Sequence, residues 1–211
     1  MNRRSFNTMA AVLLALPMMS IAQESAQQVP TQSQLPYREV APKPEDSKKA
    51  LIFVSFTCPV CAGYHEQLAQ WAKSLPKGWT AEFVPVVEAQ RDTVIAARAF
   101  YAAKSINAAY LPTFMTYAYS AIQDRGMPVG AGKTWEFVAG SSHLTGFDSA
   151  WKNVSQSTVQ SAFNKLIAYR INATPSVAIG GRYVITPDST NGDQELFFKL
   201  ANGMVSKAMT N

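Results

Sequence analysis

A strongly apolar segment of strand length leads almost directly to a pair of cysteines. Residues 50–56 read Ala-Leu-Ile-Phe-Val-Ser-Phe, which is typical of a strand that is buried on both faces of a sheet. After Thr57 come Cys58, Pro59, Val60 and Cys61. Proline is favoured at the first position of a helix, where its missing N–H would have no partner anyway. This segment therefore predicts a buried strand followed by a helix whose N-cap is Cys58.

The residues after Pro59 have helical spacing as far as the stop signal Pro76-Lys77-Gly78. One apolar stripe is formed by Cys61, Tyr64, Leu68, Trp71, Ala72 and Leu75. Cys58 would lie at the positive end of this helix, where the backbone N–H groups of Val60 and Cys61 can stabilise its thiolate. The thiolate is the attacking species in thiol chemistry. The pattern predicts Cys58 as the nucleophile and the shielded Cys61 as the resolving cysteine.

The two cysteines also allow structural interpretations. They are the only cysteines of the chain, and a disulfide between them would close a four-residue loop. Such a loop is worth roughly 2 kcal/mol, against about 4–5 kcal/mol for a loop of ~100 residues. A zinc site would need His65 and His143, the only histidines, which lie far apart in the sequence. A redox pair is favoured, no metal is expected, and the inert disulfide and the zinc site stay open as alternatives.

The N-terminus is typical of an exported protein. Arg3 and Arg4 precede a short apolar run that ends in Ser20-Ile21-Ala22, so residues 1–22 are predicted to be a cleaved signal peptide rather than an uncleaved anchor. The Sec route is favoured, although Arg3-Arg4-Ser5-Phe6 also resembles a twin-arginine signal. Residues 23–36 are rich in Gln, Ser and Pro and predict a flexible leader. Cleavage lowers the net charge from +5 by two, and no basic cluster suggests nucleic-acid binding.

The remaining chain alternates strands and helices and so predicts an α/β protein. A second strand is expected at residues 80–87, and a long, mostly helical stretch follows, with helices at residues 93–106, 112–123 and 157–170. Two strands at residues 176–179 and 183–185, joined by a two-residue Gly180-Gly181 turn, form a predicted hairpin. An amphipathic helix starting near Leu196 ends the chain, and residues 37–40 add an edge strand.

The motif from Phe56 to Cys61, together with Thr174-Pro175 before the hairpin and the segment Phe147-Asp148-Ser149-Ala150-Trp151, resembles the DsbA family of periplasmic dithiol oxidases. The resemblance implies a thioredoxin fold with an inserted helical domain. Residues 37–90 would form its first part, residues 91–172 the insertion and residues 173–211 the second part. It also implies a cis Thr174–Pro175 bond against the cysteine pair, with the backbone of Thr174 pairing to a substrate peptide.

The same resemblance implies the partners. We expect a monomer that needs no cofactor, acts on unfolded or reduced exported polypeptides in the periplasm and is reoxidised by a DsbB-like membrane protein. The function predicted is a thiol–disulfide oxidoreductase that introduces disulfides through Cys58 and Cys61. A reductase or isomerase for dedicated clients and a redox-inactive, chaperone-like binding module are the alternatives.

Three positions depart from the family pattern. Val60 stands where members usually have His, and Ile52 stands where they have a buried acid. Thr174 is similar to the residue before the cis-proline in the isomerase branch, where oxidases more often have Val. Pro59 and Val60 form the dipeptide that tunes the redox pair, and Val60 offers no side-chain donor. We therefore expect a weaker oxidant than relatives with His at this position.

Overall fold

The predicted buried strand is β2 (Lys49–Val54), and all residues from Ala50 to Val54 are buried. The computed structural model describes residues 35–210. The predicted signal peptide and residues 23–34 of the predicted leader lie outside this range, so both stay predictions. Within the described range, the strands form one five-stranded sheet in the order β1-β5-β4-β2-β3. Only β2 and β3 run parallel among its pairs, and the other neighbours are antiparallel.

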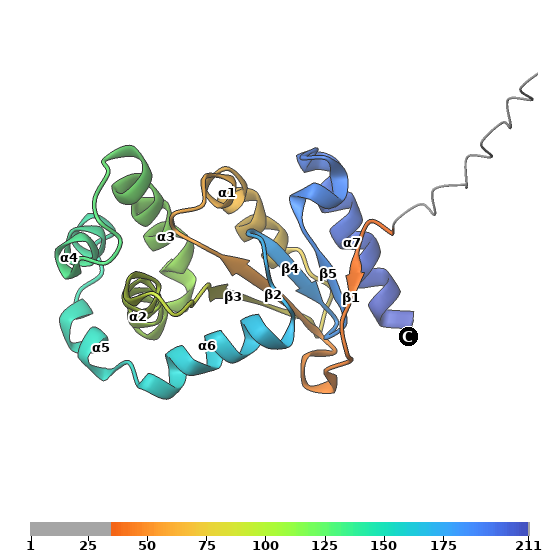
Figure 1. Ribbon diagram of the computed structural model, residues 1–211, viewed down its shortest axis with the longest axis horizontal. Helices are drawn as coiled ribbons and strands as arrows, with labels where there is room; N and C mark the ends of the chain where they lie inside the picture. Colours follow the sequence, from red (N-terminus) through yellow and green to blue (C-terminus); the bar gives the residue numbers. More distant parts are fainter. Residues whose placement is uncertain (1–34, 211) are drawn as a thin grey trace, which may run out of the picture. The chain divides into compact units, whose positions relative to one another are not determined.

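The elements follow the alternation that the sequence predicts (Figure 1). The other strands are β1 (Arg38–Glu39), β3 (Thr80–Pro85), β4 (Ser176–Ile179) and β5 (Tyr183–Ile185). The helices are α1 (Pro59–Lys73), α2 (Arg91–Ile106), α3 (Leu111–Tyr119), α4 (Gly132–Ser141), α5 (Phe147–Asn153), α6 (Gln156–Ala168) and α7 (Gln194–Thr210).

Helices cover both faces of the sheet, which explains why β2 is apolar along its whole length. Ile52 and Val54 face α1 and α7, where they share a core with Leu68 and Phe197. Residues at alternating positions face the other way, because side chains of a strand alternate between faces. Leu51 and Phe53 pack there with Val159, Ala162 and Leu166 of α6. Figure 1 shows α1 and α6 on opposite sides of the strands.

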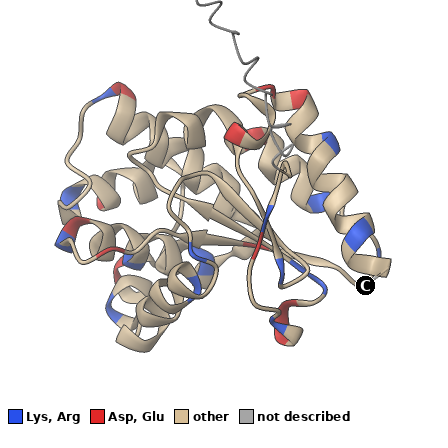
Figure 2. Cartoon of the chain, turned by 45° about the vertical axis from the view of Figure 1, so that its right-hand side comes forward, with Lys and Arg blue, Asp and Glu red and all other residues tan. Residues whose placement is uncertain are grey.

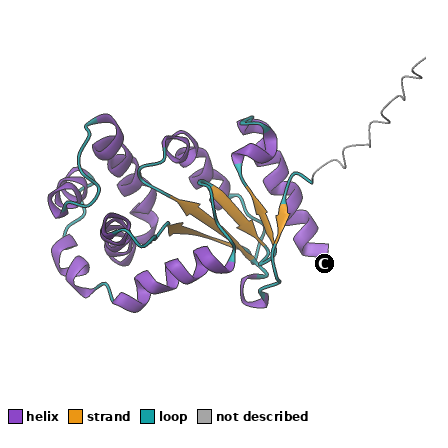
Figure 3. Ribbon diagram, viewed as in Figure 1, coloured by secondary structure: helices purple, strands orange, loops and turns teal. Residues whose placement is uncertain are grey.

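Helices α2 to α6 lie between β3 and β4 in the sequence, as expected for a thioredoxin fold with a helical insertion. Figure 3 shows most of this helical region gathered to the left of the strands. The chain from Leu35 onward nevertheless forms one compact unit. The exact domain boundaries at residues 90 and 172 therefore stay predictions.

One local expectation is confirmed with a difference in detail, and another is wrong. Residues 112–123 are helical as predicted, but α3 is followed by a π-helical segment, Ser120–Asp124, in which the N–H of Arg125 donates to Ser120 O at 3.1 Å. The hairpin connection has three residues rather than two, because Ile179 pairs with Tyr183 and Arg182 belongs to the turn. Its N–H donates to Ile179 O at 3.2 Å. In addition, α4 is a helix that the sequence pattern had not indicated.

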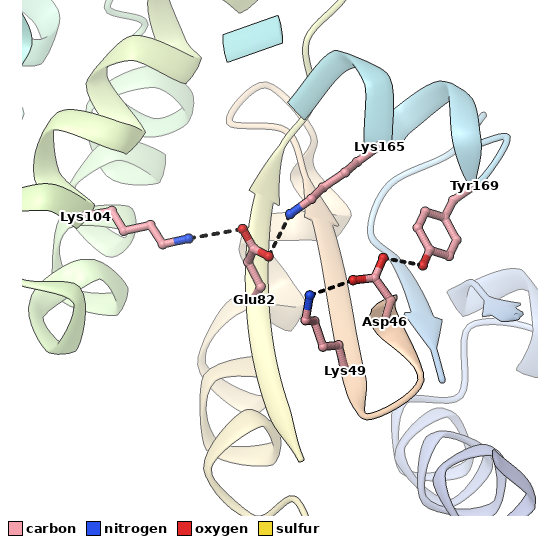
Figure 4. Close-up of polar contacts among 6 residues, drawn as sticks. All are labelled: Asp46, Lys49, Glu82, Lys104, Lys165 and Tyr169. Atoms are coloured by element: carbon pink, nitrogen blue, oxygen red, sulfur yellow. Dashed lines mark hydrogen bonds and ion pairs between the residues drawn. The ribbon is translucent and has the colours of Figure 1, made fainter. Parts of the chain in front are cut away.

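Charged groups connect the insertion to the sheet (Figure 4). Glu82 of β3 accepts from Lys104 of α2 at 3.2 Å and from Lys165 of α6 at 2.7 Å. Next to this cluster, Asp46 accepts from Lys49 at 2.8 Å and from the hydroxyl of Tyr169 at 2.7 Å. The Glu82 contacts join α2 and α6 to β3, and the Tyr169 hydroxyl joins the end of α6 to Asp46, which lies just before β2.

Other charges are spread over helices and loops rather than gathered on one element (Figure 2). None of the helices between residues 35 and 210 combines the length and the apolar character needed to cross a membrane.

Candidate active site

Cys58 is the N-cap of α1, and Pro59 is the first residue of that helix. The residues before Cys58 leave β2 in a tight turn, in which the N–H of Cys58 donates to Ser55 O at 3.2 Å. The N–H of Cys61 donates to Cys58 Sγ at 3.3 Å, so the sulfur serves as the capping acceptor of the helix. The side chain of Val60 is 45% exposed and offers no polar group.

Thr174 and Pro175 lie against the cysteine pair although they are more than 110 residues away in the sequence. The thiol of Cys58 donates to the carbonyl oxygen of Thr174 at 3.1 Å. The Thr174–Pro175 peptide bond is cis, and Pro175 is buried directly before β4. The antiparallel pairing of β4 with β2 places this loop beside the start of α1.

The two cysteines have opposite electrostatic environments. The hydrogen bond with the Cys61 side chain has the largest effect on Cys58 and lowers the pKa of Cys58 to about 5, against the opposing effect of burial. Further hydrogen bonds from the Thr174 side chain and from the backbone of Cys61 and Val60 also lower it. The sequence predicts this direction, because a helix N-terminus favours negative charge.

Cys61 is fully buried in the core between β2 and α1. The same hydrogen bond with Cys58, and then burial, raise the pKa of Cys61 above its ordinary value. The N–H of Ser55 donates to Cys61 Sγ at 3.5 Å. Ile52, which stands at the position of the family's acid, is buried and cannot exchange a proton with this thiol. The pair thus combines a half-buried sulfur that ionises readily with a buried sulfur that holds its proton.

Three residues near the pair were not singled out by the sequence analysis for this site. Gln123, in the π-helical segment, donates its side-chain amide to Phe56 O at 2.8 Å and to Cys58 O at 3.1 Å. Tyr119 packs against Phe56 with ring centroids 5.5 Å apart and against His65 at 5.4 Å. A signal existed only for His65, which lies four residues after Cys61 and so falls on the buried stripe of α1.

A cavity of about 270 Å³ opens beside Cys58. Its apolar side chains come from α6, from the residue after β3 and from the loop before Pro175, and polar side chains line the rest. Its lining includes Ser55, Cys58, Val86, Leu166, Ile171 and Thr174. An extended polypeptide placed here would pass directly by the sulfur of Cys58.

The two histidines of the zinc alternative have different environments. His65 Nε2 lies 2.8 Å from the carbonyl oxygen of Pro112, whereas His143 is exposed in a loop after α4. Among residues 35–210, no group of three His, Cys, Asp or Glu side chains is arranged to hold a metal ion. Cys58 and Cys61 are both free thiols in this structure.

Comparison with known proteins agrees with this geometry. The model of the family described as Thioredoxin matches residues 43–196, which is most of the chain. The chain belongs to the thioredoxin family. Among curated relatives, the thiol:disulfide interchange protein DsbA of Bordetella pertussis is 26% identical over 168 residues, covering 78% of this chain and 79% of that protein.

Solved DsbA structures share the fold of this thioredoxin-family chain. DsbA of Pseudomonas aeruginosa superimposes with a TM-score of 0.70 at 18% identity, covering 82% of this chain and 92% of that one. A Proteus mirabilis DsbA variant with a non-covalently bound peptide, PWATCDS, gives a TM-score of 0.70 at 17% identity, covering 82% and 95%. The chain is thus a DsbA-like thiol–disulfide oxidoreductase of the thioredoxin superfamily.

Proposed function

We propose that this DsbA-like protein is a periplasmic dithiol oxidase that introduces disulfides into exported polypeptides, with Cys58 as the nucleophile and Cys61 as the resolving cysteine. The lowered pKa of Cys58, about 5, carries the proposal. A sulfur that is stable as a thiolate is a good leaving group, and a fold that stabilises the reduced pair makes the disulfide more oxidising. The predicted signal peptide at residues 1–22 supports export.

The reaction transfers two electrons from the substrate to the protein. A substrate thiolate attacks Sγ of Cys58 in the Cys58–Cys61 disulfide, a substrate–Cys58 disulfide forms, and Cys61 leaves and takes up a proton. A second substrate thiolate then attacks the substrate sulfur of the mixed disulfide. The substrate disulfide forms, and Cys58 leaves as the thiolate. A DsbB-like membrane partner would reoxidise the pair.

The substrate would bind in the cavity beside Cys58. The Proteus mirabilis relative binds a cysteine-containing peptide non-covalently. In this chain, the apolar side chains of Val86, Leu166 and Ile171 provide contact area for an unfolded chain, and the backbone of Thr174 lies next to the sulfur. Burial of apolar surface gives affinity without sequence preference, which suits many clients.

The opposite direction of electron flow is the second candidate. Val60 favours it, because no side-chain donor at this position adds to the stabilisation of the thiolate. A less stabilised thiolate lowers the reduction potential and favours a reductase or isomerase for dedicated clients.

One experiment separates the roles and the direction. Oxidised protein is mixed with a reduced, unfolded polypeptide that contains two cysteines, and the products are separated under acid-quenched, non-reducing conditions. We expect the wild-type protein to yield oxidised substrate and reduced enzyme. Reduced Cys61→Ala, offered an oxidised substrate, should accumulate a mixed disulfide at Cys58, and Cys58→Ala should trap none. Trapping by Cys58→Ala alone would reverse the roles, and an unchanged reduced substrate would exclude the oxidase.

A further inference from the structure

A second cavity lies beside the first turns of α1. It measures about 310 Å³ and opens between α1 and the segment formed by α3 and the following π-helical turn. It shares no lining residue with the cavity beside Thr174. It lies next to the backbone of Cys58, because Ala62 and Gln123 in its wall donate to Cys58 O at 3.3 Å and 3.1 Å. Its lining includes the polar and charged residues His65, Glu66, Tyr119, Gln123 and Asp124.

The N–H donors of His65 and Gln123 in this cavity are used within the protein, whereas their acceptor atoms remain. His65 Nε2 must carry a proton, since it lies 2.8 Å from the carbonyl oxygen of Pro112. Burial lowers the pKa of His65, so the ring is neutral and Nδ1 holds a lone pair. His65 is only 4% exposed, and Nδ1 has no partner among the described residues.

Gln123 shows the same imbalance. Its amide nitrogen donates to Phe56 O and Cys58 O, which leaves the amide oxygen as the group that can still accept. Tyr119, 5% exposed, has a buried hydroxyl, able to donate or to accept, without a partner among residues 35–210. Buried polar groups without partners are rare in native structures, and two of the three among residues 35–210, at His65 and Tyr119, line this cavity.

The charges at the rim have a single sign. Glu66 and Asp124 are exposed and are the charged residues of the lining. Neither forms an ion pair with a described residue. The neighbouring Arg125 is turned away, with its guanidinium 5.0 Å from the ring centre of Phe137. The cavity therefore presents acceptors and negative charge and lacks a cation.

We propose that this cavity is a subsite for a basic side chain, Arg or Lys, of the polypeptide whose cysteine reacts with Cys58. A guanidinium has five donors and no acceptor, and an ammonium has three donors and no acceptor, so each complements this lining. The inference rests on the proposed function, because it assumes that a polypeptide is the substrate.

The reach from the sulfur sets the position of that side chain. The cavity lies beside the first turns of α1, and at 1.5 Å per residue its walls begin about 6–10 Å from Cys58. An extended chain covers about 3.3 Å per residue. The basic residue should therefore lie about two or three residues from the substrate cysteine.

The test uses peptides that differ in one group. Each contains a cysteine and, three residues away, either arginine or its neutral isostere citrulline; a second set has serine in place of cysteine. We expect mixed-disulfide formation and binding of the serine peptides to favour arginine by about five- to tenfold at low salt. The double variant Glu66→Gln/Asp124→Asn should reduce the preference to less than twofold. The control Glu136→Gln/Asp148→Asn removes two exposed carboxylates elsewhere and should keep it.

Each outcome has a defined meaning. Equal behaviour of the arginine and citrulline peptides with wild-type protein would overturn the subsite, as would a preference that survives in Glu66→Gln/Asp124→Asn. Competition of free arginine amide with the arginine peptides would support the subsite, because it would show that the cavity binds the basic side chain without the rest of the peptide. Absence of exchange with every cysteine peptide, combined with discrimination between the serine peptides, would reject the proposed oxidase and retain the subsite.

Discussion

At the scale of single residues, the chemistry depends on the position of Cys58 at a helix start and of Cys61 one turn later. The backbone N–H of Cys61 and the thiol of Cys61 both act on the Cys58 sulfur, which lowers its pKa to about 5. The carbonyl oxygen of Thr174 accepts a hydrogen bond from the same sulfur in its thiol form. The two thiols should therefore differ in reactivity by orders of magnitude near neutral pH.

Alkylation of the reduced protein tests this difference. We expect the rate at Cys58 to rise with pH through a midpoint of about 5 and to level off above it, because only the thiolate reacts. Cys61 should stay unlabelled, since it is buried and its pKa is raised. In denaturant, both cysteines should be labelled with a midpoint near ~8.5. Equal labelling of the two cysteines in the folded protein would contradict the assignment of their roles.

Val60 offers a second prediction at this scale. Val60→His places a donor beside the Cys58 sulfur, so we expect a lower pKa of Cys58 and a higher reduction potential. For this two-electron couple, each ~30 mV corresponds to about 1.4 kcal/mol. Equilibration with glutathione gives both potentials, and Val60→Leu, which adds no donor, serves as the control. An unchanged or lower potential in Val60→His would show that the identity of this exposed residue does not matter.

The sequence predicts the part of this site that is formed by neighbouring residues, from Cys58 into α1. It does not predict the contact with Gln123, which is distant in the sequence. The proline after Cys58 and the apolar stripe of α1 depend on neighbouring residues, so they can be read directly. Gln123 reaches Cys58 across 65 residues, and no periodic pattern indicates that contact. Its orientation comes from the π-helical turn, which single-residue preferences do not reveal. Thr174 and Pro175 were found through the family resemblance rather than through spacing.

At the scale of elements, Glu82 joins α2 and α6 to the sheet. The sequence shows a strand at this position but gives no indication that its one carboxylate meets two lysines from different helices. Burial alone would raise the pKa of Glu82, but the hydrogen bond from Lys165 and the charges of Lys104 and Lys165 hold it below its ordinary value. The carboxylate is thus more favourable in the folded protein than in the unfolded chain.

Glu82→Gln should lower the free energy of unfolding by about 1–3 kcal/mol at pH 7, because two partly buried lysines lose their partner. Since the pKa is lowered on folding, this contribution is present above the unfolded value of ~4.3 and is lost as the pH falls through the folded value. Urea unfolding at pH 7 and pH 3 should therefore show a difference between wild type and variant that shrinks in acid. Glu195→Gln, which removes an exposed ion pair with Lys199, should have no measurable effect. A difference that is the same at both pH values would contradict the role of the charge.

At the scale of the whole molecule, the redox state and the stability of the fold are linked through Cys58. Reduced protein contains a thiol whose pKa falls on folding, from ~8.5 in an unfolded chain to about 5. Oxidised protein contains a disulfide that does not titrate. Cys61 is also a thiol only in the reduced form, but between pH 5 and pH 7 it stays protonated in the folded and in the unfolded protein, because its pKa is ~8.5 in an unfolded chain and is raised by folding. The remaining titratable groups are common to both forms, so they cancel when the two free energies of unfolding are subtracted.

The difference in unfolding free energy between reduced and oxidised protein should therefore depend on pH in a defined way. A lowered pKa contributes stability that is present above the unfolded value and is lost as the pH falls through the folded value. We expect the reduced form to gain about 2 kcal/mol relative to the oxidised form between pH 5 and pH 7. Denaturant unfolding of both forms across this range measures it, and reduced Cys58→Ser should lack the gain. Through the thermodynamic cycle, the potential of the folded pair exceeds that of an unfolded dithiol by an amount that grows by about 30 mV per pH unit in this window. Parallel pH profiles of the two forms would mean that the thiolate of Cys58 is not stabilised by the fold, and the physical basis of an oxidising pair would be lost.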